Sequence, residues 1–318
     1  MITRAAFGEQ IARRLGERFH DARLLHAGEN GLVFSARDPA AHGERRAVRV
    51  PYPNEGTDAG HAIRFRRLVA LAQAVSHPHI ARVHTTELID GLEVAVTELA
   101  GPLRVDHLIV ATRPPTVHRI LTVLREIGEA LDLLHAAGIV HGALRPSRVL
   151  LDASGHVKLT GMLLRAGETP PHPALRPAAV GDPAYMAPEQ WHAEMATPAM
   201  DRYAVGVMAY ELYTAEPRVT HLDASVAVHP LQIPLQRPLR PDVPLAVNEV
   251  LRRATHADPG MRYASVRELV DALERPHTPV SAHAVAAPAP EAGSASRISP
   301  RMWGLIVALI AALLLLLT

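Results

Sequence analysis

The stretch of sequence that decides the fold reads Gly181-Asp182-Pro183-Ala184-Tyr185-Met186-Ala187-Pro188-Glu189-Gln190. The chain before it falls into two parts. Residues 21–98 hold short runs of β-type residues interrupted by one helical stretch, Ala62 to Val75, an order that predicts a small antiparallel sheet with a single helix against it. From Thr116 onward apolar residues recur at helical spacing, so a mainly helical part is predicted to follow.

These ten residues resemble the segment G-T-P-x-Y-M-A-P-E-Q, which closes the activation loop of the bacterial Ser/Thr protein kinases called Hanks-type or eukaryotic-like. Two later segments fit the same family: residues 201–207 (DRYAVGV) resemble its D-x-Y-A-x-G-V motif, and residues 258–263 (DPGMRY) resemble its D-P-x-x-R-F motif. The match covers roughly residues 19–274. The resemblance implies an α+β fold of two lobes, with a β-rich lobe over residues 19–100 and a larger helical lobe over residues 101–275.

The resemblance also identifies positions that hold such a fold together. It implies that Glu189 pairs with Arg262, and it gives structural roles to Asp182 and Asp201. Removing one partner of a buried ion pair typically costs about 3 to 5 kcal/mol. The presence of both partners therefore predicts that the fold is retained.

The positions that carry the chemistry differ from the family. In its catalytic loop, H-R-D-L-K-P-x-N, the aspartate orients the attacking hydroxyl, the lysine steadies the γ-phosphate and the asparagine holds a magnesium ion. Residues 141–151 read HGALRPSRVLL and put Ala143, Arg145 and Arg148 at these three positions. Gly161 stands in place of the D-F-G aspartate, the second magnesium ligand. A methyl group accepts no proton and a cation repels magnesium, so the resemblance implies that metal-dependent phosphoryl transfer is lost.

The small lobe differs in the same way. Arg49 takes the place of the V-A-I-K lysine, and Leu68 takes the place of its glutamate partner, so the ion pair of active kinases cannot form. Lys158, the single lysine of the chain, precedes the D-F-G position and is expected to face solvent. Arg145 and Asp182 replace two residues that meet in active relatives, and we predict a salt bridge between them; independent drift is the alternative.

A site for a nucleotide base is still predicted between the lobes. The resemblance maps the apolar slot onto Val33, Ala47 and Leu150, beside hinge backbone near Glu98 and Ala100, with Gly28 and Gly31 in the glycine loop and Arg49 in reach of a phosphate. These residues favour the binding of ATP or another nucleotide without magnesium. The alternative is that these residues only pack the core between the lobes.

Composition excludes several classes of function. Lys and Arg number 33 against 32 for Asp and Glu, so the chain lacks the large positive net charge that would favour nucleic acid as a partner. The chain has no cysteine, which excludes disulfides and thiolate chemistry and fits a reducing compartment. Its 19 histidines include no second pair at metal-ligand spacing beside His77 and His79, so no metal site is predicted.

The two ends of the chain are predicted to lie outside the kinase-like body. Residues 1–18 form an N-terminal extension without the apolar core of a signal peptide, and the Pro-, Ala- and Ser-rich residues 276–301 form a disordered linker.

Residues 302–318 are uncharged and mostly apolar, which predicts a short transmembrane helix, with a buried helix of the body as the alternative. Arg297 and Arg301 precede this span, so the body is expected in the cytoplasm at the inner membrane. The small residues Gly304, Ala308 and Ala312 would allow a homodimer through this helix.

Together these observations favour a membrane-anchored pseudokinase that acts as a binding, scaffold or regulatory module for an unidentified protein. The main alternative is an enzyme, a Ser/Thr kinase-like protein with weak or atypical ATP-dependent transferase activity. A third hypothesis is a membrane assembly partner that acts through its last helix.

Overall fold

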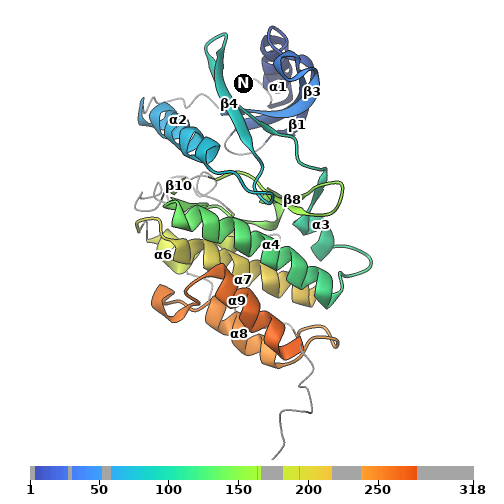
Figure 1. Cartoon of the computed structure of the whole chain (residues 1–318), viewed down its shortest axis with the longest axis vertical. Helices are drawn as coiled ribbons and strands as arrows, with labels where there is room; N and C mark the ends of the chain where they lie inside the picture. The colour runs from blue at the N-terminus through green and yellow to red at the C-terminus, as the bar shows by residue number, and fades with distance from the viewer. Residues whose placement is uncertain are drawn as a thin grey trace, which may run out of the picture. The chain divides into compact units, whose positions relative to one another are not determined.

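The computed structural model describes residues 4–27, 31–51, 59–162, 164–165, 182–192, 194–216 and 238–277. Residues 1–278 form one compact unit. Figure 1 shows that a small lobe built around a β-sheet lies next to a larger lobe built mainly of helices. The predicted bilobal α+β fold is confirmed.

The small lobe is a five-stranded antiparallel sheet in the order β1-β2-β3-β5-β4. Its strands are β1 (His20–Ala27), β2 (Gly31–Asp38), β3 (Glu44–Pro51), β4 (Val83–Ile89) and β5 (Leu92–Glu98). The single predicted helix is α2, Ala59–Ala74, which contacts β4. Its observed start lies three residues before the predicted one, and its end one residue earlier.

The two faces of this sheet have different neighbours, because alternate side chains of a strand point to opposite faces. Leu32, Phe34 and Val48 lie on one face and are buried in an apolar cluster. Helix α1, Arg4–Leu15, covers this face with Ile11 and Leu15, both fully buried. Fully burying a side chain of this size stabilises the fold by roughly 1.5–3 kcal/mol, so α1 is an integral part of the small lobe.

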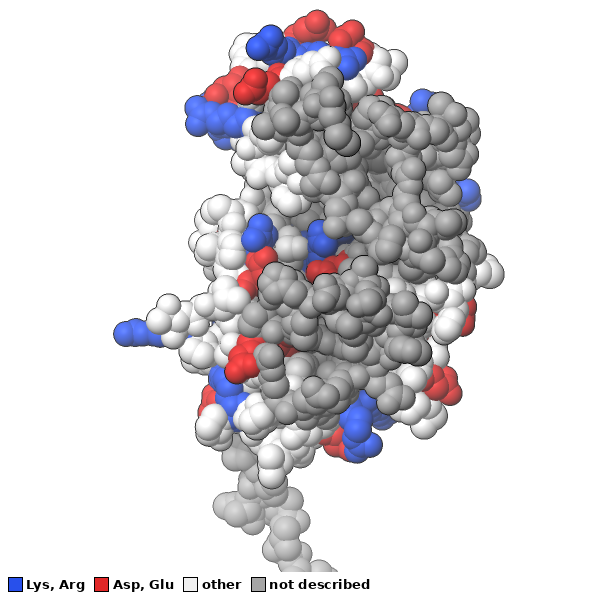
Figure 2. Space-filling view, turned by 180° about the vertical axis from the view of Figure 1, so that it is seen from behind, with Lys and Arg blue, Asp and Glu red and all other residues white. Residues whose placement is uncertain are grey.

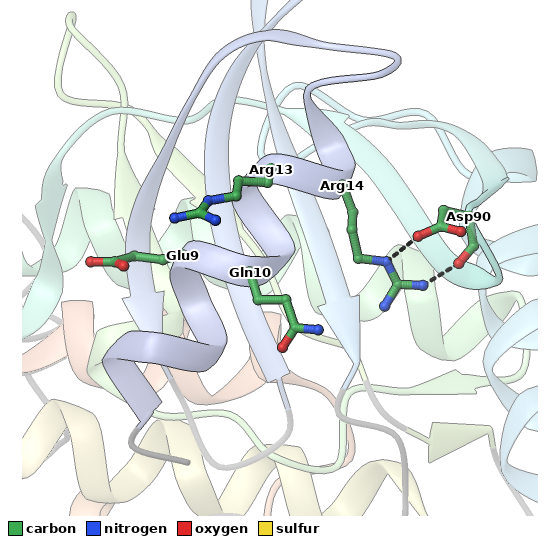
Figure 3. Close-up of a pocket in the computed structure, with 5 residues that line it drawn as sticks. All are labelled: Glu9, Gln10, Arg13, Arg14 and Asp90. Carbon is green, nitrogen blue, oxygen red and sulfur yellow. Dashed lines mark hydrogen bonds and ion pairs between the residues drawn. The ribbon is translucent and has the colours of Figure 1, made fainter.

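The end of α1 is also fixed by charge. The Arg14 guanidinium reaches Asp90 in the turn between β4 and β5, with Nε 2.5 Å from Oδ2 (Figure 3). Arg18 pairs with Asp38 and with Glu87, at 2.7 and 2.8 Å. These contacts join α1 and the residues just after it to β2, to β4 and to the β4–β5 turn.

The large lobe is organised around buried helices. Its elements are β6 (Leu103–Arg104), α3 (Val105–Ile109), α4 (Val117–Ala136), β7 (Ile139–Val140), β8 (Val149–Leu151), β9 (Val157–Leu159), β10 (Leu164–Arg165), α6 (Pro188–Trp191), α7 (Pro198–Thr214), α8 (Ala246–Ala254) and α9 (Val266–Glu274). Helix α4 contacts α7 and α9, and these helices follow one another through the lobe in Figure 1. Thr116 caps α4 by accepting a hydrogen bond from the Arg119 N–H. Nearly every residue of α7 is buried, as expected for the central helix of the lobe.

Backbone hydrogen bonds connect the two lobes behind the cleft. Leu159 of β9 donates its N–H to the His79 carbonyl at 2.8 Å, and its own carbonyl accepts the Ala81 N–H at 2.9 Å. Ile80, between them, is buried in the core of the large lobe. The segment between α2 and β4 is therefore anchored on the large lobe.

The predicted linker from residue 278 onward and the predicted transmembrane helix, residues 302–318, lie outside the described residues. Among the residues that the structure describes, none of the helices has the length and apolar character needed to cross a bilayer. The proposed homodimer contact at Gly304, Ala308 and Ala312 lies outside them as well. The predicted domain boundaries therefore stay predictions at this end of the chain.

Candidate functional site

The scaffold of the large lobe is held by a buried ion pair. Arg262 donates from Nη1 to Glu189 Oε1 at 2.6 Å and from Nη2 to Oε2 at 2.8 Å. The two side chains are 0% and 5% exposed. Arg262 also donates to the carbonyls of Ala199 and His256, so its guanidinium is well satisfied inside the lobe. The pair implied by the sequence resemblance is present.

Asp201 holds the loop that carries the catalytic position. Its carboxylate accepts the backbone N–H groups of His141 and Gly142, each at 2.8 Å, and lies 2.8 Å from His135 Nε2. Burial alone would raise the pKa of Asp201, but the hydrogen bonds from His135 and the backbone hold it below its usual range. Gln190 Nε2 donates to the Gly142 carbonyl from the other side. The loop is therefore rigidly supported although its tip is Ala143.

Arg148 and Gly161, which stand at the two positions of the family's magnesium ligands, contact each other. Arg148 Nη1 donates to the Gly161 carbonyl at 3.0 Å. Gly161 has a φ of +83°, and a Cβ placed on it would lie 3.2 Å from Arg148 Cδ. The arginine side chain thus fills the space that any side chain at position 161 would need. The two residues offer a fixed cation and no carboxylate, so they do not fit a magnesium ion.

The predicted salt bridge between Arg145 and Asp182 is wrong. Asp182 Oδ1 accepts the Ala184 N–H at 3.0 Å, and the Asp182 carbonyl accepts the Tyr185 N–H at 3.0 Å. The carboxylate therefore caps its own turn, a local contact that competes with a distant partner. Arg145 Nε is buried and has no hydrogen-bond partner in the described part of the chain.

The expectation that Lys158 faces solvent is also wrong. Its side chain is 15% exposed, and Nζ lies 2.7 Å from Oε1 of Glu98 at the end of β5. The other oxygen of Glu98 accepts the Arg82 N–H at 3.1 Å. In the three-stranded sheet β6-β8-β9, Lys158 lies directly opposite Leu150, so both side chains share one face of this sheet.

Positively charged side chains of both lobes act on His26. Burial and the charges of Arg145, Arg104, Arg148 and Arg49 lower the pKa of His26, at the end of β1. Burial lowers the pKa of Arg49, which has no ion-pair partner among the described residues, and Leu68, half-buried on α2, offers it none. Arg104 pairs with Asp106 at 3.0 Å. The positions of the family's catalytic and phosphate-binding lysines are therefore part of a cluster of arginines.

The predicted base slot is only partly described. Val33 and Ala47 lie on the cleft-facing side of β2 and β3, and Leu150 lies half-buried on the opposite wall. Gly28 falls outside the described residues. Gly31 has a φ of +144°, and a Cβ there would lie 2.2 Å from the Val50 carbonyl oxygen, so only glycine fits between these strands. Ala100, at the hinge, is half-buried.

Of two hollows among the described residues, one lies in the small lobe and one beside the loop that carries Ala143. One, of about 430 Å³, lies between α1 and the β4–β5 turn and is lined by polar side chains from Glu9 to Arg14 and by Asp90 (Figure 3). The other, near Ala143 and Asp182, has about 10 Å³, room for roughly one water molecule. Within the described residues, no group of three or more histidines and carboxylates is placed to hold a metal ion.

Comparison with known proteins agrees with this architecture. Residues 19–272 match the family model described as the protein kinase domain. The chain belongs to the protein kinase family. It is 29% identical over 270 residues to the serine/threonine-protein kinase PknA of Mycobacterium tuberculosis, a match covering 83% of this chain and 62% of that protein. It is 26% identical over 264 residues to PrkC of Bacillus subtilis, covering 81% and 40%. The chain therefore matches less than two thirds of the length of these curated relatives.

Sequence reasoning alone missed two parts of this kinase-family site. It did not include Arg104, and it left Lys158 without a partner. The register of the strands places Arg104 and Lys158, because Arg104, Leu150 and Lys158 form one row across β6, β8 and β9. Alternation along a single strand does not give that register.

Proposed function

We propose that this member of the protein kinase family is a pseudokinase, a binding or regulatory module that does not transfer phosphate with the help of a metal. The observation that carries the proposal is the contact between Arg148 and Gly161. Both of the family's protein ligands for magnesium are replaced, and the replacements fit each other within 3.0 Å. A cation that is already held at this place opposes the entry of a second one.

The position of the general base supports the same proposal. Ala143 is buried, on a loop whose backbone is fixed by Asp201 and Gln190. A neighbouring acid would have to reach the substrate hydroxyl in its place, but Asp182 is engaged in its own turn and Asp201 in the loop backbone. Loss of one group that stabilises a transition state typically costs about 10² to 10³ in rate. Loss of the base and of both metal ligands together removes the mechanism.

The test is transfer from radiolabelled ATP, with the full chain and either Mg²⁺ or Mn²⁺ present. We expect no labelling of the chain or of a general protein substrate above the background of a boiled sample. The competing hypothesis is a weak or atypical Ser/Thr kinase, favoured by the names of the relatives. Transfer that depends on the added protein and disappears in Arg49→Ala would establish that hypothesis instead.

We also propose that residues 302–318 anchor the chain in the inner membrane, with the kinase domain in the cytoplasm, where it binds another protein. The apolar composition of this segment and the preceding Arg297 and Arg301 support the proposal. Because the chain has no cysteine, single variants report on sidedness. In intact spheroplasts we expect an impermeant maleimide to label Thr318→Cys and not Ser299→Cys, which should react only after lysis. Equal labelling of both variants in intact spheroplasts would refute this topology.

A further inference from the structure

We propose that pH controls how tightly the small lobe is attached to the large lobe, through a cluster of three histidines and two glutamates at the joint between them. The members of this histidine cluster are His77, His79, His156, Glu126 and Glu129. Uptake of a proton by the cluster tightens the segment between α2 and β4 on helix α4. The proposal does not rest on the proposed function, because none of these residues belongs to the phosphate-transfer site.

The joint between the lobes passes through His79. The His79 carbonyl accepts the Leu159 N–H at 2.8 Å, and the Leu159 carbonyl accepts the Ala81 N–H at 2.9 Å. Ile80, between these two bonds, is buried in the core of the large lobe. The His79 side chain is itself only 13% exposed. A change in the contacts of this side chain therefore acts directly on the joint.

Both ring nitrogens of His79 face groups that only accept hydrogen bonds. Nδ1 lies 3.2 Å from the Val157 carbonyl oxygen, so Nδ1 carries a hydrogen. Nε2 lies 3.7 Å from Oε2 of Glu129. A neutral ring would turn the lone pair of Nε2 toward this carboxylate, whereas a protonated ring presents an N–H on both sides. Proton uptake by His79 therefore turns an unfavourable contact into an ion pair with α4.

Glu126 connects His79 to the histidine of the β8–β9 turn. This buried carboxylate accepts the Val157 N–H at 2.8 Å, and its Oε1 lies 2.7 Å from His156 Nδ1. Its Oε2 lies 3.9 Å from His79 Nδ1, and the rings of His79 and His156 are 6.0 Å apart. The hydrogen bond from His156 to Glu126, together with the carboxylate charge, raises the pKa of His156. The two histidines thus share one acidic partner on the large lobe.

His77 acts in the opposite sense and limits the device at low pH. Its Nδ1 accepts the His79 N–H at 3.2 Å, a role that only the neutral ring can fill. Burial and the charge of His79 lower the pKa of His77. The other described charged groups that act on the cluster are Asp152, which raises the pKa of His156, and Arg119, which lowers it. The joint should therefore be tightest at mildly acid pH, where His156 is charged and His77 is neutral.

Charge elsewhere on the surface does not replace these contacts. Lys and Arg side chains on the face drawn in Figure 2 are interspersed with Asp and Glu, so the described residues form no single-sign patch there. At physiological salt, exposed charges more than about 8 Å apart are largely screened from each other. The response of the joint to pH should therefore come from the contacts within the histidine cluster.

The first experiment measures amide hydrogen exchange of the full chain, purified in mild detergent, between pH 8 and pH 6. The reporters are the amides of Ala81 and Leu159, which make the two bonds between the lobes. The closed joint binds the proton more tightly than the opened joint, so acidification favours closure. Protection of both amides, relative to the intrinsic exchange rate at each pH, should rise about fivefold as the pH falls.

Three variants make this test specific. His79→Asn keeps a donor for the Val157 carbonyl but cannot become charged, and Glu129→Gln removes the carboxylate of a side chain that is 52% exposed. Each should reduce the rise in protection to less than about twofold. His118→Asn removes an exposed histidine of α4 outside the cluster and should behave like the parent. Equal rises in the parent and in both cluster variants would overturn the proposal. A loss of protection that is the same at every pH would also overturn it, because it would show a contact without proton uptake.

The second experiment asks whether the joint controls the lobes. Because the chain has no cysteine, a donor dye and an acceptor dye can be attached at Leu88→Cys and Leu245→Cys, which lie in different lobes and are exposed. The distribution of distances between the dyes should be narrower at pH 6 than at pH 8, and Glu129→Gln should remove the difference. A distribution that does not change with pH would overturn the control of lobe attachment while leaving the pseudokinase proposal intact. Phosphate transfer in the radiolabel assay would have the reverse consequence.

Discussion

Two arginines of the large lobe lie in opposite kinds of surroundings. Arg262 is fully buried and meets both oxygens of Glu189, at 2.6 and 2.8 Å. Arg148 donates a hydrogen bond to the backbone carbonyl of Gly161. Gly161 stands at the position where kinases that use magnesium have the D-F-G aspartate. The first arrangement stabilises the fold and leaves no charge uncompensated. The second contributes a cation to a cleft that already contains other cations.

The difference shows that fold and chemistry are separable in this chain. Glu189, Asp201 and Arg262 form a closed set, in which each of these three buried charged side chains has a described partner. The residues around Arg49 and Arg145 form an open set, in which the partners are missing. A closed set predicts loss of stability on mutation. An open set predicts loss of binding with little effect on stability.

The largest effect is expected from breaking the closed set at Glu189. Glu189→Gln leaves the Arg262 charge buried with weaker partners, so the free energy of unfolding should fall by about 3 to 5 kcal/mol. Urea denaturation followed by circular dichroism measures this change. Glu249→Gln is the matched control, because Glu249 is 66% exposed and its loss should change stability by less than about 0.5 kcal/mol. Similar effects in the two variants would contradict the distinction between the sets.

The pH dependence of stability tests the same closed set through His141. Burial lowers the pKa of His141 to about 4, so between about pH 6.5 and pH 4 the unfolded chain binds a proton that the folded chain does not. Stability should therefore fall by roughly 3 kcal/mol as the pH decreases through this window. His141→Gln should remove most of that dependence, measured by urea denaturation at a series of pH values. An unchanged profile in the variant would mean that other groups cause the acid sensitivity.

Much of the closed set could be predicted from the sequence, and much of the open set could not. The charged residues of the large lobe lie in long motifs, so the resemblance to the family identifies Glu189, Asp201 and Arg262. Helix α2 was predicted to within three residues at either end. The pairing of Arg145 with Asp182 was wrong because a carboxylate two residues before a free N–H forms a local turn more readily than a distant bridge. The partner of Lys158 depended on a strand register that periodicity does not provide.

A smaller effect is expected from restoring a carboxylate at Gly161, next to Arg148. In Gly161→Asp, the new Cβ would lie 3.2 Å from Arg148 Cδ, and the backbone has a φ of +83°, so stability should fall by about 1 to 3 kcal/mol. Combining this change with Arg148→Asn should recover part of the loss, because the crowding side chain is removed. A double-mutant cycle on urea midpoints measures this coupling. Additive effects would show that the two positions do not depend on each other.

The smallest effect is expected at Lys158, where the two sets meet. Its ion pair with Glu98 joins β9 to the hinge and is more exposed than the pair at Glu189, at 15% and 29% for its two side chains. Lys158→Met should therefore lower the free energy of unfolding by about 1 kcal/mol, since solvent screens part of the attraction. Arg252→Gln removes one partner of an exposed pair, at 67% and 66%, and should have almost no effect. A loss of stability in Lys158→Met no larger than that in Arg252→Gln would show that the ion pair with Glu98 does not support the hinge.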